Sequence, residues 1–273
     1  MVSFRGKNIL ITGASSGIGE ALAFEFARLG GNLALMARRQ DRLVEIGKYL
    51  QSQYSTVKVV PIKADVADEG SFQLGYEKTI EEMGHLDVVV ANAGFSVAGQ
   101  LAELSLEDYR RQFEINVFGV LRTVKITIPA LQSSQGRLAI VGSVNGYVSL
   151  PGISAYAMSK FSVRALCDAL YHELKPLGIS VTHIAPGFVV SEIRKVNNHG
   201  ILREKAQDPI PLWLQMKTSI AARKMVRAIY RRKKERVVTS HGWWIVKLSR
   251  LFPGFMTFLI GFFGIKARSE PRS

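Results

Sequence analysis

The sequence predicts an α/β fold in which one doubly wound parallel sheet occupies residues 1–240 and a hydrophobic, basic extension follows in residues 241–273. Three observations support this fold. Short apolar runs alternate with amphipathic segments, a glycine-rich loop follows the first apolar run, and 273 residues that are 47% hydrophobic can bury one large core. Strict alternation of strands and helices indicates parallel strands joined by right-handed crossovers.

The predicted strands are short, continuous and rich in Val, Ile and Leu, as buried parallel strands are. They cover residues 8–12, 32–37, 57–62, 87–91, 137–141 and 180–184. The helix-like segments lie near residues 17–29, 39–53, 69–84, 101–132, 154–175 and 217–234, and we expect 101–132 to be broken. Ligands of doubly wound sheets bind at the carboxyl ends of the strands, so the residues that follow each strand form the candidate site.

The loop after the first strand reads TGASSGIG, at residues 12–19. Gly13 and Gly17 would let the backbone turn tightly and approach a pyrophosphate, and Gly19 would let the next helix pack close to the sheet. The helix N-terminus offers N–H groups to phosphates. We therefore predict dinucleotide binding by Gly13, Ser15, Ser16, Gly17, Ile18 and Gly19.

The end of the second strand discriminates between NAD and NADP. Enzymes that use NAD usually place an acidic residue there to bond the ribose 2′-hydroxyl. Here the strand ends at Ala37 and continues with Arg38 and Arg39. Guanidinium groups bind phosphate well, so the sequence favours NADP(H), with Arg38 as the first choice and Arg39 as the second.

Tyr156 and Lys160 stand four residues apart, with small Ala157 and Ser159 between them. On a helix, both side chains project from one face, one turn apart. Such a pair is common on solvated helices, so its meaning depends on the other motifs of the chain.

These motifs together resemble the short-chain dehydrogenase/reductase family over residues 7 to about 238. The resemblance rests on separated motifs in a fixed order: TGASSGIG at 12–19, Asp65-Val66, Ala91-Asn92-Ala93-Gly94, Asn116, Ser143, Tyr156-Ala-Met-Ser-Lys160 and Pro186-Gly187. It implies a Rossmann-type domain that transfers hydride between NADP(H) and a ketone or secondary alcohol, and a homodimer or homotetramer.

The resemblance also implies catalytic roles. Tyr156 is similar to the family's general acid, which protonates the ketone oxygen. A free tyrosine has a pKa of ~10, and a lysine one turn away would lower it. Ser143 would orient the carbonyl, and Asn116 would belong to the proton relay or bond the backbone at a helix break.

Further cofactor contacts are implied in the same way. Asp65 and Val66 would lie near the adenine. The turn after the fourth strand would lie against the cofactor, although Ala91 stands where many members have a second asparagine. The contacts expected from these two regions and from the loop after the sixth strand are Asp65, Val66, Asn92, Ala93, Gly94, Tyr156, Lys160, Pro186, Gly187, Val189 and Ser191.

The segments expected to bind substrate are apolar, which favours a large hydrophobic ketone or alcohol. They carry Phe95, Val97, Tyr147, Val148, Leu150, Ile153, Phe188, Val189, Val190, Ile193, Ile201, Leu202, Ile210, Leu212, Trp213, Leu214 and Met216. Part of this set is expected to make core or subunit contacts instead. Steroids, retinoids, long acyl chains and ketosphingoid bases all fit this description.

The net charge of +14 is concentrated near the C-terminus. Residues 219–273 hold 13 Lys and Arg against Glu235 and Glu270, a net charge of +11. Such a patch suits an anionic membrane surface better than nucleic acid, because it adjoins an apolar segment and because the chain lacks a zinc module or an aromatic RNA-reading motif. We expect no nucleic-acid partner.

Other cofactor and location classes are also constrained. The single cysteine, Cys167, excludes an internal disulfide and a cysteine-based zinc site, and the histidines show no metal-ligand spacing. The N-terminal MVSFRGK leads directly into the first strand, so we expect no cleavable signal peptide and a cytoplasmic protein, at most peripheral to a membrane.

Residues 243–265 are aromatic and apolar but are interrupted by Lys247, Arg250 and Pro253-Gly254. A membrane-spanning helix needs ~20 mostly apolar residues, which disfavours a span. An interfacial anchor fits, and so does a tail that closes the pocket or makes a dimer contact. In layout the tail resembles that of lipid-active family members such as 3-ketosphinganine reductases. A non-catalytic dinucleotide sensor or scaffold on the same fold is the alternative function.

Overall fold

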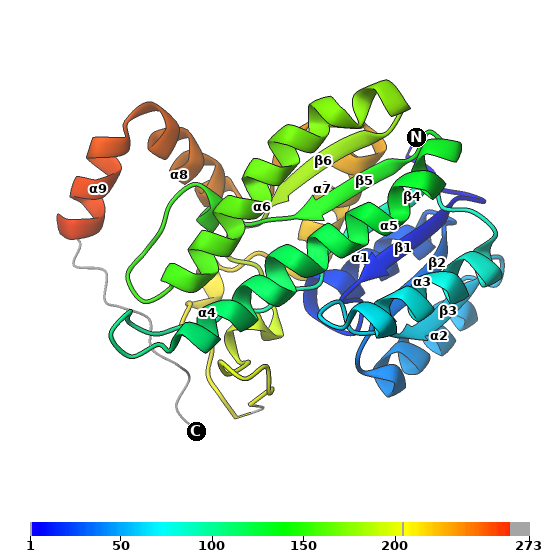
Figure 1. Cartoon of the computed structure of the whole chain (residues 1–273), viewed down its shortest axis with the longest axis horizontal. Coiled ribbons are helices and arrows are strands. Elements are labelled where there is room, and N and C mark those ends of the chain that lie inside the picture. Colours follow the sequence, from blue (N-terminus) through cyan, green and yellow to red (C-terminus); the bar gives the residue numbers. More distant parts are fainter. Residues whose placement is uncertain (1, 204, 263–273) are drawn as a thin grey trace.

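The computed structural model describes residues 2–203 and 205–262. Its centre is a parallel sheet in the order β3-β2-β1-β4-β5-β6-β7 (Figure 1). The strands are β1 (Asn8–Thr12), β2 (Asn32–Ala37), β3 (Val59–Lys63), β4 (Val88–Ala91), β5 (Arg137–Val141), β6 (Ser180–Ala185) and β7 (Glu235–Val237). The predicted doubly wound α/β fold is confirmed.

Helices cover both faces of the sheet. The helices are α1 (Gly17–Arg28), α2 (Gln40–Gln53), α3 (Glu69–Met83), α4 (Leu106–Phe113), α5 (Gly119–Ser133), α6 (Ser154–Glu173), α7 (Thr218–Tyr230), α8 (Ser240–Leu251) and α9 (Pro253–Phe262). One apolar core joins the sheet to α1, α2 and α7, and a second core joins its other face to α3, α5 and α6.

The strand order reverses between β1 and β4, which pair in register from Ile9 with Val88 to Ile11 with Val90. At such a switch point the connections diverge to opposite faces of the sheet and leave a crevice at the carboxyl ends of the strands. The glycine loop follows β1, and the segment that begins with Asn92 follows β4. The fold therefore brings these two predicted cofactor segments together.

Three predicted boundaries were wrong. The third strand begins at Val59 and extends to Lys63, whereas 57–62 was expected. The helix expected at 101–132 begins at Leu106 and continues through a π-helical turn, Glu114–Phe118, so it is distorted but not interrupted. The helix expected at 217–234 ends at Tyr230, because Arg232 has a φ of 49°. The strand β7 follows it and was not predicted.

The expected C-terminal extension corresponds to α8 and α9 as far as Phe262, and its residues 263–273 lie outside the described residues. The two helices stand out at one end of the molecule (Figure 1). The predicted break between them is confirmed, since α9 begins at Pro253. Within 2–203 and 205–262, no helix combines the length and the apolar character needed to span a membrane.

Candidate active site

The glycine loop takes a conformation that side chains would obstruct. Gly13 and Gly17 have φ values of 66° and 57°, in the left-handed region where glycine is favoured. A Cβ atom on Gly13 would lie 2.7 Å from the Cα atom of Ala93, and one on Gly19 would overlap the carbonyl oxygen of Gly13. The roles predicted for these glycines, a tight turn and close packing of α1, agree with this geometry.

Hydrogen bonds of Thr12 and Asn92 connect the glycine loop to the segment that follows β4. The Thr12 hydroxyl accepts hydrogen bonds from the backbone N–H groups of Asn92 (3.0 Å) and Ala93 (3.1 Å). The Asn92 side-chain amide donates to the carbonyl oxygens of Thr12 (3.0 Å) and Gly13 (3.2 Å). The side chain of Asn92 therefore positions the glycine loop. Thr12 was missed as a positioning residue, although it begins the motif.

Arg38 and Arg39 follow β2 and have different surroundings. The Arg39 guanidinium donates to the Ser15 hydroxyl (3.2 Å) and to the Glu192 carboxylate (3.0 Å). The Arg38 side chain is 59% exposed, and its nearest Nη atom lies 4.0 Å from an Asp65 carboxylate oxygen. Arg39 is therefore bonded to the glycine loop and to Glu192, whereas Arg38 is the more exposed of the two.

Asn116 lies in the π-helical turn and is fully buried. Its amide donates to the carbonyl oxygen of Phe95 and to the Ser159 hydroxyl, each at 3.1 Å, and its oxygen accepts from the N–H group of Phe95 at 3.0 Å. Single π-helical turns occur often at functional sites. The backbone contact expected of Asn116 is present and connects the segment after β4 to the helix that carries Tyr156.

Tyr156, Lys160 and Ser143 line the same cavity, and Lys160 reaches the end of β5. Helix α6 places Tyr156 and Lys160 one turn apart, with the Lys160 Nζ atom 5.7 Å from the centre of the Tyr156 ring. Lys160 is buried and donates to the carbonyl oxygen of Val141 at 3.0 Å. Burial lowers the pKa of Lys160 to about 8. The Ser143 hydroxyl accepts from the backbone N–H of Asn145 at 3.1 Å.

One cavity of about 1030 Å³ joins these parts. The residues that the sequence analysis assigned to catalysis or cofactor binding all lie within the described parts of the chain. All of them except Asn116 line this cavity. Asn116 lies behind the lining, where its oxygen would be 3.0 Å from a Cβ atom on Gly94. The arrangement suits a dinucleotide along the glycine loop and a reacting group between Ser143 and Tyr156. The individual roles stay predictions.

The part of the cavity beyond Tyr156 is apolar, but its lining differs from the expected set. Leu212 and Trp213 are exposed and lie outside it. The extension contributes a wall, as expected for a tail that closes the pocket, which was one of the alternatives that the sequence left open. The apolar lining includes Phe95, Val148, Leu150, Phe188, Val189, Ile193, Val196, Ile201, Leu202, Trp244, Ile245, Leu248, Met256, Leu259 and Ile260.

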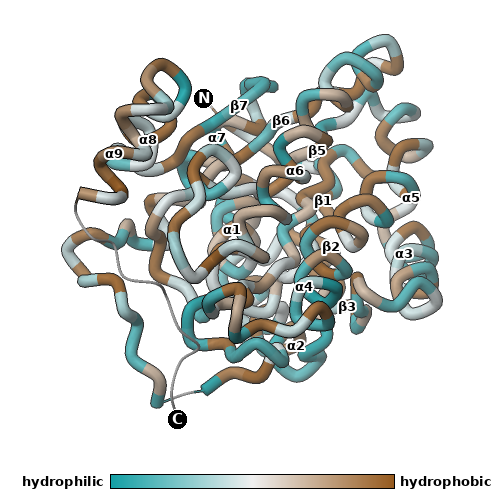
Figure 2. Tube along the Cα trace, turned by 60° about the vertical axis from the view of Figure 1, so that its left-hand side comes forward, coloured by the Kyte–Doolittle hydropathy of each residue, from teal (hydrophilic) through white to brown (hydrophobic). Residues whose placement is uncertain are grey.

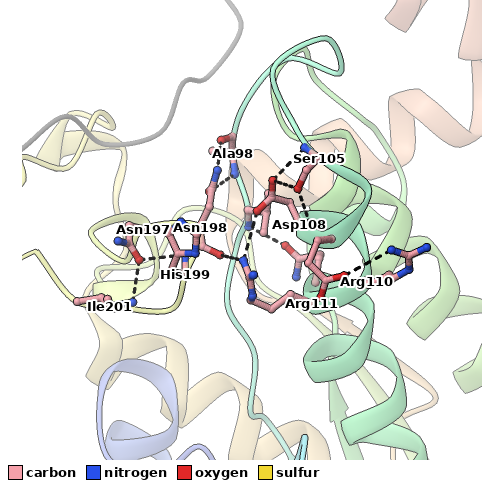
Figure 3. A network of polar contacts seen from close by, with 12 residues as sticks. Ala98, Ser105, Asp108, Arg110, Arg111, Asn197, Asn198, His199 and Ile201 are labelled. Carbon is pink, nitrogen blue, oxygen red and sulfur yellow. Dashed lines mark hydrogen bonds and ion pairs between the residues drawn. The ribbon is translucent and has the colours of Figure 1, made fainter.

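The loop after β6 is held over the cavity by polar contacts with the segment before α4 (Figure 3). The Asn198 side chain exchanges two hydrogen bonds with the backbone of Ala98, each at 2.9 Å. Arg111 on α4 donates to the carbonyl oxygen of Asn198 at 2.9 Å and to Asp108 at 3.3 Å. These contacts place His199, the next residue, at the cavity wall.

Tyr147 was expected in the substrate pocket but lies in a buried polar group behind it. Its hydroxyl donates to Glu235 and contacts the Nδ1 atom of His183 at 3.1 Å. Arg250 on α8 pairs with Glu235 at 2.7 Å, so the same group attaches α8 to β7. Burial and the neighbouring Glu235 raise the pKa of Tyr147, and burial lowers the pKa of His183 to about 4.

A glycine loop at the switch point and a Tyr–Lys–Ser group in the same cavity are the features of a Rossmann-fold oxidoreductase. A family model described as "short chain dehydrogenase" matches residues 7–201. The chain belongs to the short-chain dehydrogenase family.

Named relatives agree with this assignment. The chain is 36% identical over 188 residues to "Dehydrogenase/reductase SDR family protein 7-like" of Anopheles gambiae, covering 67% of this chain and 59% of that protein. It is 33% identical over 250 residues to "11-beta-hydroxysteroid dehydrogenase A" of Sesamum indicum, covering 88% and 70%. An alcohol dehydrogenase from Thermococcus sibiricus, solved with 5-hydroxy-NADP, superposes with a TM-score of 0.73 at 29% identity, covering 85% of this chain and 95% of that one.

Proposed function

We propose that this protein is an NADPH-dependent oxidoreductase that reduces a ketone, or oxidises the matching secondary alcohol, on a hydrophobic, lipid-like substrate. The observation that carries the proposal is the single cavity lined by the glycine loop, by Tyr156, Lys160 and Ser143, and by an apolar wall. A non-catalytic sensor would need the glycine loop but neither the Tyr156, Lys160 and Ser143 group nor the apolar wall.

The residues present fit a dinucleotide. Gly13, Gly17 and Gly19 let the loop turn tightly and let α1 pack close to it, and all three line the cavity, where a pyrophosphate would lie against the loop. Arg38 and Arg39 supply the positive charge that a 2′-phosphate requires. The Thermococcus relative solved with 5-hydroxy-NADP supports the same choice of cofactor.

The bound dinucleotide supplies or accepts the hydride. In the reductive direction, the Tyr156 hydroxyl donates its proton to the ketone oxygen, and the Ser143 hydroxyl holds that oxygen by a hydrogen bond. The charge of Lys160 favours departure of the proton from Tyr156. Asn116 maintains the geometry by fixing the backbone at Phe95 against α6 through Ser159.

The hydrophobic substrate class follows from the wall of the cavity. Aliphatic and aromatic residues from the loop after β6 and from α8 and α9 form this wall, and such a surface excludes small polar substrates. The name of the sesame relative, a hydroxysteroid dehydrogenase, supports a rigid or extended lipid-like ketone. None of the three relatives described above is named for a sphingoid substrate, so the proposal stays at the level of the class.

A homodimer or homotetramer accompanies this proposal. Phe118, the last residue of the π-helical turn before α5, is 48% exposed, and Met158 and Phe161 on α6 are 51% and 41% exposed. These side chains suit a contact between copies through α5 and α6, which we expect multi-angle light scattering to detect as a dimer or tetramer. A monomer at micromolar concentration would contradict it.

Replacing Tyr156 with Phe tests the proposed chemistry, because it removes only the hydroxyl. Turnover of a ketone drawn from a steroid, retinoid and acyl panel should fall ~10²–10⁴-fold, while NADPH binding measured by fluorescence stays nearly unchanged. Tyr49→Phe is the matched control, because the Tyr49 side chain on α2 is exposed. Retention of more than about a tenth of kcat in Tyr156→Phe would refute the catalytic assignment. NADPH binding without turnover of any ketone would favour a sensor.

A further inference from the structure

Helix α9 has two apolar faces with different surroundings. The inner face, Met256, Leu259 and Ile260, lines the cavity. The outer face carries Phe255, Phe258 and Phe262, which are 50%, 61% and 71% exposed. The spacing of these rings places them along one side of the helix, and neighbouring rings stack with centres 6.4 and 5.7 Å apart.

The outer face is unusual for a helix in contact with water. A surface helix of a globular protein normally carries polar and charged residues on its outer side. Residues 253–262 contain no charged residue, and Thr257 supplies their only polar side chain. Figure 2 shows much of α9 as hydrophobic where the helix pair stands out from the body of the protein. Contiguous exposed apolar patches of this kind mark interaction surfaces.

Positive charge gathers beside this surface. Arg250 at the end of α8 contacts Glu235, the residue that follows the basic turn at residues 231–234. Residues 231–250 hold seven Lys and Arg (Arg231, Arg232, Lys233, Lys234, Arg236, Lys247 and Arg250) and one acid, Glu235, a net charge of +6. Two of these cations are paired with carboxylates, Lys234 with Asp168 and Arg250 with Glu235. The ammonium group of Lys247 lies 4.9 Å from the ring of the exposed Trp243. Aromatic rings flanked by cations match the boundary of an anionic bilayer.

We propose that the outer face of α9 and the corner that joins it to α8 dock on an anionic membrane surface, and that the inner face admits the apolar substrate from the lipid to the cavity. The second part rests on the proposed function. Ten helical residues extend about 15 Å, half of the hydrocarbon thickness, so α9 lies in the boundary and does not cross it. The aromatic rings of the outer face enter the lipid, and the basic turn attracts the headgroups.

Cosedimentation of the full chain with vesicles tests the docking surface. Vesicles of phosphatidylcholine with phosphatidylserine should bind the protein, vesicles of phosphatidylcholine alone should bind it weakly, and added salt should reduce binding. The double variant Phe255→Ser/Phe258→Ser should bind at least about tenfold more weakly. Leu74→Ser is the control, because Leu74 lies on α3 and is 68% exposed.

The charge contribution is tested separately. Arg231→Ser/Lys233→Ser should weaken binding to anionic vesicles by about fivefold per charge and leave binding to neutral vesicles unchanged. Lys48→Ser is the matched control, because Lys48 is an exposed residue of α2. Failure of the wild-type protein to bind either vesicle overturns the proposal. A change of oligomeric state in the Phe255→Ser/Phe258→Ser variant, with unchanged vesicle binding, would show that this face contacts a second copy and would also overturn it.

Activity distinguishes the docking surface from the proposed function. The variant Phe255→Ser/Phe258→Ser should reduce a small soluble ketone at the wild-type rate, because neither ring lines the cavity. It should reduce a ketone embedded in anionic vesicles at least about tenfold more slowly. If no ketone is reduced by the wild-type protein but vesicle binding is lost in the variant, the docking surface stands and the proposed function fails. If the wild-type protein and the variant reduce the ketone embedded in vesicles at equal rates, the proposal that substrate enters the cavity past α9 is overturned.

Discussion

Lys160 should reduce the stability of the protein, and Lys160→Met should therefore stabilise it while abolishing activity. The lysine side chain is buried at the end of β5 and donates to the carbonyl oxygen of Val141 at 3.0 Å. Its pKa is lowered by burial to about 8, from 10.5 for a free lysine. At neutral pH the folded protein therefore holds a positive charge that its surroundings disfavour.

The size of this effect follows from the pKa. The difference between 10.5 and about 8 corresponds to about 3 kcal/mol of destabilisation at pH 7. Loss of the hydrogen bond to Val141 offsets about 1 kcal/mol. Methionine is close to lysine in length and apolar, so it fills the same space. We expect Lys160→Met to raise the free energy of unfolding by about 2 kcal/mol at pH 7.

Urea unfolding at several pH values measures this effect. Between about pH 8 and 10.5 the unfolded wild-type chain binds a proton at Lys160 that the folded protein does not bind, so the free energy of unfolding should rise with pH in this window. The variant lacks the group and should lack this rise. Lys48→Met, at an exposed position, should change stability by less than about 0.5 kcal/mol.

Two results would refute this reasoning. If Lys160→Met is less stable than the wild type at pH 7, burial does not penalise the ammonium group. If the variant keeps the wild-type rise in stability above pH 8, another group titrates there. Loss of ketone reduction alone would be uninformative, since a purely structural lysine could produce the same loss.

Two further predictions concern the cofactor and the buried polar group. Arg38→Asp should raise KM for NADPH by about tenfold or more and change KM for NADH far less, because it replaces a phosphate-binding charge with a repelling one. If steady-state kinetics show an unchanged preference for NADPH over NADH, Arg38 does not bind the 2′-phosphate. His183 has a pKa of about 4, against 6.5 when unfolded, so acid favours the unfolded chain. Stability should therefore fall as the pH decreases from 6.5 to 4, and thermal unfolding of His183→Gln should show a smaller fall.

The sequence predicted six strands of the sheet and the cofactor side of the cavity because their signals are local. Each buried strand except β7 is an apolar run, and each cofactor segment follows a strand end, where the chain offers glycine, asparagine or arginine in a recognisable order. Parallel topology then brings distant strand ends together without further information. This is why Gly13, Asn92 and Ser143 line one cavity although 130 residues separate the first from the last.

The missed features depend on contacts between distant segments. Strand β7 has only three residues, of which Glu235 and Arg236 are charged, as is common on a sheet edge. Its pairing with β6 and the bond between Glu235 and Arg250 are tertiary contacts. The wall formed by α8 and α9 follows from that attachment. An apolar extension has the same composition whether it faces a cavity, a lipid surface or both, so composition alone did not place Leu259 in the lining.

The π-helical turn at Glu114–Phe118 has a consequence for insertions and deletions in this region. It adds one residue to the helix relative to a continuous α-helix, and one residue corresponds to a rotation of about 100°. Deleting a residue there would restore a regular helix. It would also rotate either Asn116 away from Phe95 or the apolar stripe of α5, including Val120 and Val124, away from the sheet. The length of this turn is therefore constrained even where its side chains are exposed, because the extra residue allows α4 and α5 to face different partners within one continuous helix.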